Sequence, residues 1–436
     1  MRLTATRTSV TSAGGAGDAL YRAAGGRPTL DQRFAKDKAL VDKISGNNLI
    51  TFSRASSGTY VDSDGLIKTA VADAPRFDHD PVTGESLGLL IEEERTNLAK
   101  YSEPDDRSTN NVSGEWRFAN LDPNTEITKV EGPDGVSNSA SEMQLATGNS
   151  YDAYLHQVPV TSGASYTFSA WIKLGTATNF ALHVNDTTDY DSVPDGTYSF
   201  DVNDGLNTNT FVKVSHKFTA PSNGKVNVHI GRHGGTAPAQ QTQGTVTVWG
   251  CQVELGAFSS STIITSGSTV TRSPDLATIE GTNFSSWYNQ SEGTFVTISS
   301  SVSNLESTEN RGIFQITDQT LAASFYRQLV LYRGTSKAFF FASKDNNANS
   351  FNPTNAGDPS YDNDTLAYGY SSSEISKVFY DGSQVSSTPS IVDWSTYNSD
   401  RLTVGSGGGT DLNGHISRLA YFPTLKTDQE LVNITS

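Results

Sequence analysis

The chain has 436 residues, of which 35% are hydrophobic, 10% are aromatic and 38 are glycines. This length predicts two or three domains, and the low apolar content with many turn-forming residues favours short strands over long helices. The balance of 31 Lys and Arg against 47 Asp and Glu gives a net charge of −16, which argues against a general nucleic-acid-binding protein. A single cysteine, Cys251, excludes an intrachain disulfide framework.

The first 48 residues are rich in Gly, Ala and Thr, and paired glycines interrupt any regular element. Residues 31–44 have a loosely helical spacing, with Asp31 as the expected N-cap. We expect residues 1–48 to form an arm that becomes ordered only against a partner, with a disordered tail as the alternative. Residues 1–30 lack the apolar core of a signal peptide, and no stretch of the chain is apolar enough to cross a membrane.

Residues 49–105 predict a small β-rich module. Three short alternating stretches, 50–54, 59–61 and 66–68, are separated by turn signals, and 87–92 is a fourth, more apolar strand. A piece of this size is too small to bury a core by itself, so we expect it to pack on something else.

Two β-sandwich (jelly-roll) domains are expected behind this module, over residues 106–275 and 276–436. In both regions short strands recur at short intervals with turn clusters between them and no helical period. Trp171 and Trp249 lie within alternating stretches and are predicted to belong to the core. The predicted fold class is therefore all-β.

Catalytic patterns are missing from the sequence: it has no nucleophile elbow, no zinc-protease motif and no phosphate-binding loop. We therefore predict that the protein is not an enzyme. His229 and His233 are four residues apart, but the glycines around them argue against a helix, so a polar loop is favoured over a metal pair.

Acidic loops offer a candidate calcium site, since hard oxygen ligands suit Ca²⁺. Asp186, Asp189 and Asp191 lie close together in one predicted loop, although without EF-hand spacing. The alternative is that these residues are solvated and form turns. No other cofactor is predicted.

Aromatic residues in loops are candidates for glycan contact, because sugar rings stack on aromatic faces while neighbouring polar groups bond their hydroxyls. The residues predicted for this role are Tyr151, Tyr154, Tyr190, Tyr361, Tyr368 and Tyr370.

The small β-rich module carries a set of motifs: TFSRAS at 51–56, TYV at 59–61, DGLI at 64–67, PRFDHD at 75–80 and LLIEEERTN at 89–97. This set resembles the N-terminal module of phage head-spike and tail-fibre proteins, which seats the appendage on the particle. The resemblance implies that Arg54, Arg76, Glu92 and Arg95 are structural anchors, in buried or inter-subunit ion pairs.

Two further segments resemble known folds. The segment VWGCQVELG at 248–256, with Gly250, Gln252 and Glu254, looks like the closing strand of a carbohydrate-binding-module type of jelly roll. The segments VFYDG at 378–382 and LNGHISRLAYFP at 412–423 are similar to laminin-G or concanavalin-like sandwiches, which implies that His415 is a strand residue and not a ligand.

Together these resemblances imply a virion structural protein, a head spike or tail fibre on the particle surface, that adheres to host-surface polysaccharide. The expected partners are other virion proteins, at a capsid vertex or at the tail or baseplate, and further copies of the chain in a trimer or pentamer. Nucleic-acid binding and membrane insertion are not expected. Two alternatives remain open: a decoration protein that binds no sugar, and a capsule-degrading spike, although the β-helix repeats typical of such spikes are missing.

Overall fold

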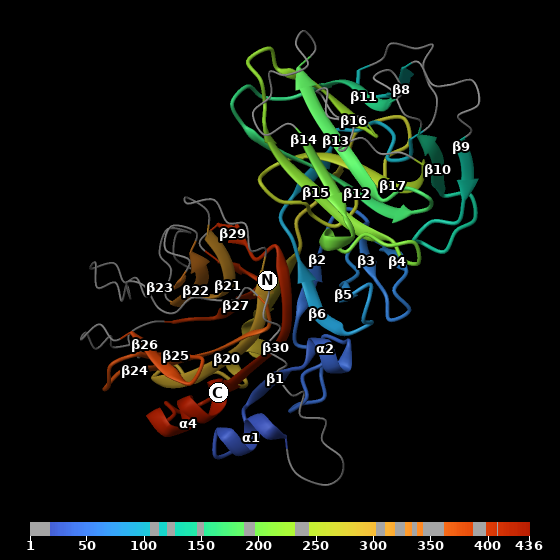
Figure 1. Cartoon of the computed structure of the whole chain (residues 1–436). Coiled ribbons are helices and arrows are strands. Elements are labelled where there is room, and N and C mark those ends of the chain that lie inside the picture. Colours follow the sequence, from blue (N-terminus) through green and yellow to red (C-terminus); the bar gives the residue numbers. More distant parts are fainter. Residues whose placement is uncertain are drawn as a thin grey trace.

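The computed structural model consists of two β-sandwich lobes (Figure 1). It describes residues 18–104, 113–119, 127–145, 152–186, 197–231, 244–301, 310–318, 328–333, 338–342, 362–386, 398–407 and 409–436. Antiparallel strands dominate both lobes, so the predicted all-β class is confirmed. No helix among these residues is both long and apolar enough to cross a membrane.

One lobe is a jelly roll of two five-stranded sheets. The first sheet, in spatial order, comprises β15 (Val212–Thr219), β12 (Ser165–Leu174), β17 (Gly244–Leu255), β10 (Ala140–Leu145) and β9 (Ile127–Val130). The second comprises β14 (Thr197–Asp201), β13 (Asn179–Asp186), β16 (Lys225–Ile230), β11 (Asp152–Pro159) and β8 (Trp116–Ala119). Residues such as Phe168, Phe180 and Val228 fill the space between the sheets.

The other lobe packs an eight-stranded sheet on a six-stranded one. The larger sheet comprises β26 (Ser383–Ser386), β25 (Lys377–Tyr380), β24 (Asp364–Ser371), β20 (Glu292–Ser301), β30 (Gly414–Phe422), β6 (Ser86–Ile91) and β5 (Phe77–His79), with β1 (Leu30–Gln32) also paired to β30. The smaller sheet comprises β2 (Thr51–Ser53), β19 (Leu276–Glu280), β27 (Arg401–Val404), β21 (Asn310–Thr317), β22 (Gln328–Arg333) and β23 (Ala338–Ala342).

The N-terminal segment supplies strands to this second lobe. Strand β30 pairs with β20 on one side, and β6 and β1 share its other side end to end, with Leu89 opposite Ile416 and Leu30 opposite Tyr421. Strand β2 likewise pairs with β19. This differs from the predicted division, in which residues 1–48 were an arm and 49–105 a separate module. Pairing between strands more than 200 residues apart leaves no local sequence pattern that would predict it.

The helix predicted over residues 31–44 is wrong. The chain forms β1 there and then the single turn of α2 (Phe34–Asp37). Asp31 caps no helix, because its buried carboxylate accepts hydrogen bonds from Arg33 at 2.6 Å and from Arg418 at 2.8 Å. The long-range ion pair outweighs the local helical preference.

Short helices cover the outer face of the larger sheet. Helix α1 (Ala19–Ala23) lies beside α4 (Asp428–Thr435), and Leu431 of α4 packs against Phe422 and Phe379 of the sheet (Figure 1). A reciprocal pair of hydrogen bonds between Thr427 and Glu430 caps the start of α4. A further short helix, α3 (Gly281–Ser285), follows β19, and β28 (Ser406–Gly407) pairs with β29 (Thr410–Asp411).

The jelly roll is inserted into the second lobe. The chain leaves along β7 (Arg95–Asn97) and returns along β18 (Val270–Arg272), and these two strands pair with each other. A hairpin of β3 (Gly58–Val61) and β4 (Ile67–Ala70) reaches across and packs on Trp171 and Trp249 of the jelly roll. Both tryptophans are buried, as predicted.

This topology makes opposite predictions for two fragments. Residues 98–266 contain the whole core of the jelly roll, so we expect this fragment to fold alone. Residues 270–436 lack β1, β5 and β6, which leaves one side of β30 unpaired, so we expect this fragment to remain unfolded. Circular dichroism and amide hydrogen exchange would distinguish the outcomes. Native-like protection in the isolated 270–436 fragment would contradict the shared-lobe topology.

Candidate functional site

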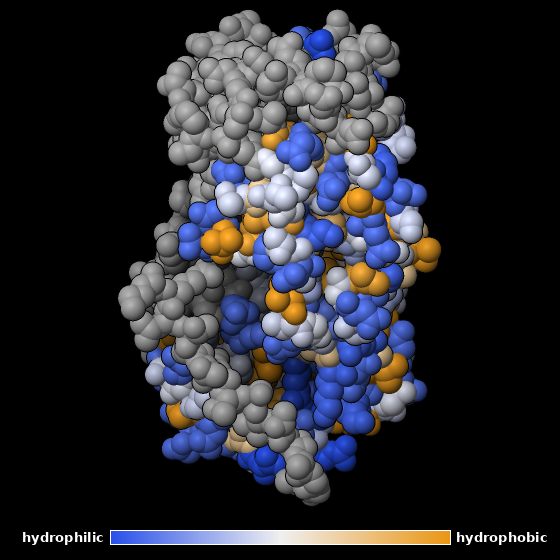
Figure 2. All heavy atoms as spheres, turned by 45° about the vertical axis from the view of Figure 1, so that its right-hand side comes forward, coloured by the Kyte–Doolittle hydropathy of each residue, from blue (hydrophilic) through white to orange (hydrophobic). Residues whose placement is uncertain are grey.

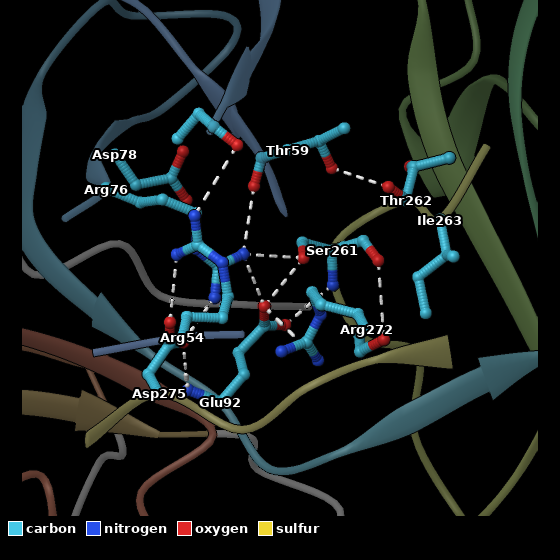
Figure 3. Close-up of polar contacts among 12 residues, drawn as sticks. Arg54, Thr59, Arg76, Asp78, Glu92, Ser261, Thr262, Ile263, Arg272 and Asp275 are labelled. Carbon is cyan, nitrogen blue, oxygen red and sulfur yellow. Dashed lines mark hydrogen bonds and ion pairs between the residues drawn. The ribbon is translucent and has the colours of Figure 1, made fainter. Parts of the chain in front are cut away.

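Buried charges meet where the two lobes join. Figure 3 shows a cluster of three arginines and two carboxylates, called the junction cluster: Arg54, Arg76, Arg272, Glu92 and Asp275. Each of the five is at most 5% exposed. A charge removed from water at this depth is tolerated only when it is paired and hydrogen-bonded, so these side chains depend on one another.

Arg76 lies at the centre of the junction cluster. Its Nη1 donates to Glu92 Oε2 at 2.7 Å, to the carbonyl of Thr59 at 3.0 Å and to Ser261 Oγ at 2.8 Å, and its Nη2 bonds Asp275. Arg54 donates to the other oxygen of Asp275 at 3.0 Å. The carboxylate of Asp275 therefore bridges two guanidinium groups and also accepts the backbone N–H of Glu92 at 2.9 Å.

Glu92 links the second lobe to the segment that leaves the jelly roll. Its carboxylate accepts from the backbone N–H and the hydroxyl of Ser261, both at 2.6 Å, and Arg272 lies 3.5 Å away. Burial by itself would raise the pKa of this carboxyl. The positive charges of Arg272 and Arg76, with the bonds from Ser261, outweigh burial and hold the pKa well below its usual range.

The structural anchors expected from the resemblance occupy two places. Arg54, Arg76 and Glu92 lie in the junction cluster, whereas Arg95 lies beside it, pairing with Glu93 at 2.5 Å and covering the ring of Phe258 at 4.4 Å. Sequence reasoning missed Arg272 and Asp275. They lie about 200 residues along the chain from Arg76, and no local motif marks them.

The Gly-x-Gln-x-Glu segment of β17 holds the returning chain. Gln252 Oε1 accepts the backbone N–H of Ile263 at 2.7 Å, and Glu254 Oε1 accepts that of Ser260 at 2.7 Å. Asn97 completes the contact by donating to the carbonyls of Cys251 and Ile263. This side of the jelly roll is therefore occupied by its own chain.

The opposite sheet of the jelly roll makes no substantial contact with the other lobe among the described residues. The strand register places Arg117, Tyr154, His229 and His183 next to one another across β8, β11, β16 and β13, and Arg117, His229 and His183 lie on the outer face. The rings of His183 and His229 lie 5.7 Å apart. His229 Nε2 lies 3.1 Å from Asn185 Oδ1 in the neighbouring row. We call this the polar face.

Basic groups gather at one end of the polar face. Burial lowers the pKa of His156, and the nearby charges of Arg117 and Lys225 lower it further. These three side chains are half-buried or exposed, whereas His183 and His229 are only 3% and 1% exposed. The arrangement offers hydrogen-bond donors and positive charge at the rim and a fixed polar row beneath.

The predicted glycan-contact tyrosines are not brought together. Tyr368 and Tyr370 are 3% and 0% exposed and belong to the core of the second lobe, so their prediction as contact residues is wrong: a buried ring cannot stack on a sugar from solvent. Their alternation along β24 indicated a core strand. The backbone of Tyr154 lies in β11 opposite His229, its role in glycan contact stays a prediction, and Tyr151, Tyr190 and Tyr361 lie outside the described residues.

The calcium site remains a prediction. Asp186 ends β13, while Asp189 and Asp191 lie outside the described residues. Within the described parts of the chain no three His, Cys, Asp or Glu side chains are grouped so as to hold a metal ion. His229 lies in β16 rather than in the predicted polar loop, and His415 is a residue of β30, as the resemblance implied.

The face seen in Figure 2 shows the described residues as mainly hydrophilic, with hydrophobic ones in small separate groups. Scattered apolar residues of this kind are normal for a soluble surface and do not form a docking patch.

Removing the central charge of the junction cluster should destabilise the fold. We expect Arg76→Met to lower the free energy of unfolding by about 3–5 kcal/mol, because Glu92 and Asp275 stay buried without their shared partner. As a control, Lys68→Met removes the solvent-exposed pair with Asp62, whose charged atoms are 3.9 Å apart, and should cost no more than about 1 kcal/mol. Urea unfolding measures both, and equal small losses would contradict the role assigned to Arg76.

No family model matches the chain, and no curated protein matches its sequence. The chain is similar in structure to the Ruminococcus gnavus IT-sialidase CBM40 bound to alpha2,3 sialyllactose, at 12% identity and a TM-score of 0.29 over 34% of this chain and 84% of that one. It is also similar to a CBM4 structure, at 14% identity and a TM-score of 0.26 over 37% of this chain and 99% of that one. TM-scores this low establish no relationship, so the assignment of all-β sandwiches rests on the sheets themselves.

Proposed function

We propose that the protein is an attachment protein of a phage-like particle, anchored through its second lobe and binding host-surface glycans through the polar face of its jelly roll. The glycan half of this proposal, that the jelly roll binds sugars, is supported by the polar face itself. One outer sheet face of the jelly roll is occupied by the returning chain and the β3–β4 hairpin, and the other presents Arg117, His156, Asn227 and Lys225 at its surface.

Glycan binding at such a face needs no deep pocket. Sugar hydroxyls bond to amide, imidazole and guanidinium groups, and half-exposed donors held by strands lose little freedom when they bind. Asn227 is fixed in this way, since its Oδ1 accepts the backbone N–H of Gln157 at 2.8 Å. Single-site affinity would be weak, and several copies on one particle would supply avidity.

The anchoring half rests on the resemblance of residues 51–97 to the particle-seating module of phage spikes and fibres. Of the strands in this segment, β2, β5 and β6 belong to the sheets of the second lobe, and Arg54, Arg76 and Glu92 of the junction cluster lie beside them. A lobe whose strands are fixed in this way is suited to hold the protein rigidly on the particle. We propose that it assembles as a closed homo-oligomer and contacts other virion proteins. The proposed activity is binding without catalysis.

The glycan half is tested on an array of bacterial surface polysaccharides, with the protein displayed multivalently on beads. For a bound glycan, we expect Arg117→Ala and His156→Ala each to weaken binding at least tenfold, equivalent to about 1.4 kcal/mol. Lys217→Ala, an exposed lysine of β15 on the other sheet, is the matched control and should bind as the wild type does.

Two results would count against this half. Absence of binding by an intact multimer favours the decoration alternative, and release of reducing ends from the polysaccharide favours a capsule-degrading spike.

The anchoring half is tested by imaging particles that carry a label at Ser436, the exposed end of the chain. We expect the label at one kind of position, a head vertex or a tail tip, in threefold or fivefold groups. Intact particles without label would contradict it.

A further inference from the structure

A cavity of about 320 Å³ lies between the two lobes. We call it the junction cavity, and it is partly open to solvent. Its walls come from β3 to β6, from β12 and β15 of the jelly roll, from the returning segment 258–262 and from the start of β30. This volume is in the range of pockets that hold small molecules.

The walls of the junction cavity are mostly apolar. Val61 and Ile67 of the hairpin, Leu90 of β6, Trp171 of β12 and Phe258 all line it, and each is at most 8% exposed. Trp171 is held in place because its Nε1 donates to Thr262 Oγ1 at 2.9 Å. A ligand with an apolar frame would bury that frame against these side chains.

The two acidic residues that line the cavity already have partners. Glu92 is bound by Arg76 and Ser261, as described above. Asp78 accepts the backbone N–H of Val61 at 2.6 Å through one oxygen and lies 2.8 Å from His415 Nε2 through the other. Both oxygens of each acid are therefore already engaged within the protein.

Two basic side chains of the cavity keep unused bonding capacity. The ammonium of Lys213 donates to the carbonyl of Ser260 and to no other group in the described chain, although it has three donors. His79 is only 4% exposed, and its Nδ1 lies 3.0 Å from the carbonyl of Val61. A carbonyl only accepts, so Nδ1 carries the proton. In the neutral imidazole, Nε2 is then a buried acceptor that has no partner among the described residues.

From this pattern we infer that the junction cavity binds a small hydroxy acid, such as a single carboxylated sugar. The carboxylate pairs with Lys213, a hydroxyl donates to Nε2 of His79, and the carbon frame contacts Trp171 and Phe258. Burial lowers the pKa of the Lys213 ammonium, and the negative charges of Glu254 and Glu92 only partly offset this effect, so an anionic ligand would stabilise the charged form. This site is separate from the polar face.

A ligand held here touches both lobes. It would contact the β3–β4 hairpin and β6 on one side and β12 and β15 on the other. Binding to the folded form alone raises stability as ligand concentration rises above its dissociation constant. Occupancy of the cavity would therefore be visible as a rise in the melting temperature of the full chain.

The test uses the full chain, with D-glucuronate as probe and D-glucose as the matched neutral sugar. Ligand-observed NMR and a thermal-shift titration measure binding. We expect glucuronate to bind and to raise the melting temperature, and glucose to bind at least tenfold more weakly. Lys213→Met should weaken glucuronate at least tenfold, and His79→Gln should weaken it less, because glutamine keeps an acceptor. Lys217→Met, on the same strand but exposed, should bind as the wild type does.

Three results would overturn the inference: no binding of glucuronate, equal binding of glucose, or unchanged affinity in Lys213→Met. Circular dichroism of each variant separates a lost ligand from a lost fold. If Lys213→Met does not fold, the comparison of glucuronate with glucose on the wild type decides the matter. The outcome is independent of the array experiment, since Arg117→Ala should leave glucuronate binding at the cavity unchanged.

Discussion

The rest of the structure depends on buried charges that have no stable arrangement except with each other. Arg76, Glu92 and Asp275 lie out of water, and each satisfies hydrogen-bonding groups of the others. Arg76 and Glu92 precede the jelly roll in the chain, and Asp275 follows it. Removing a single partner leaves an uncompensated charge, which is far more costly than loss of a surface pair. The junction cluster thereby fixes how the outgoing and returning chains pass each other.

That constraint explains how the inserted jelly roll is held against the second lobe. The jelly roll has its own core and is tied to the second lobe by a paired β7 and β18, by the hairpin on Trp171 and by the side chains of Gln252 and Glu254. The same contacts occupy one sheet of the jelly roll, whereas the other sheet carries the half-buried and exposed polar residues Arg117, His156 and Lys225 on its outer side. The junction cavity lies between the lobes, beside the place where the β3–β4 hairpin packs on the jelly roll.

Sequence patterns were informative wherever structure is local. Strict alternation in β12 placed Trp171 in a core, and the turn signals at Ser57-Gly58 and Ser63-Asp64-Gly65 marked the hairpin of β3 and β4. The same alternation in β24 was misjudged when Tyr368 and Tyr370 were assigned to glycan contact, because a strand buried on both faces hides every side chain. The helix expected from Asp31 failed because Arg418, far along the chain, binds that carboxylate.

By itself the sequence determined the all-β class, the existence of two sandwiches and the positions of many strands, because residue alternation and turn chemistry act over a few residues. Only the tertiary structure decided that β1, β2, β5 and β6 belong to the second lobe, that Asp275 and Arg272 complete the cluster around Arg76, and that Lys213 and His79 line one cavity. These features join residues separated by about 130 to 390 positions. Their stability comes from burial and charge pairing, which no short stretch of sequence encodes.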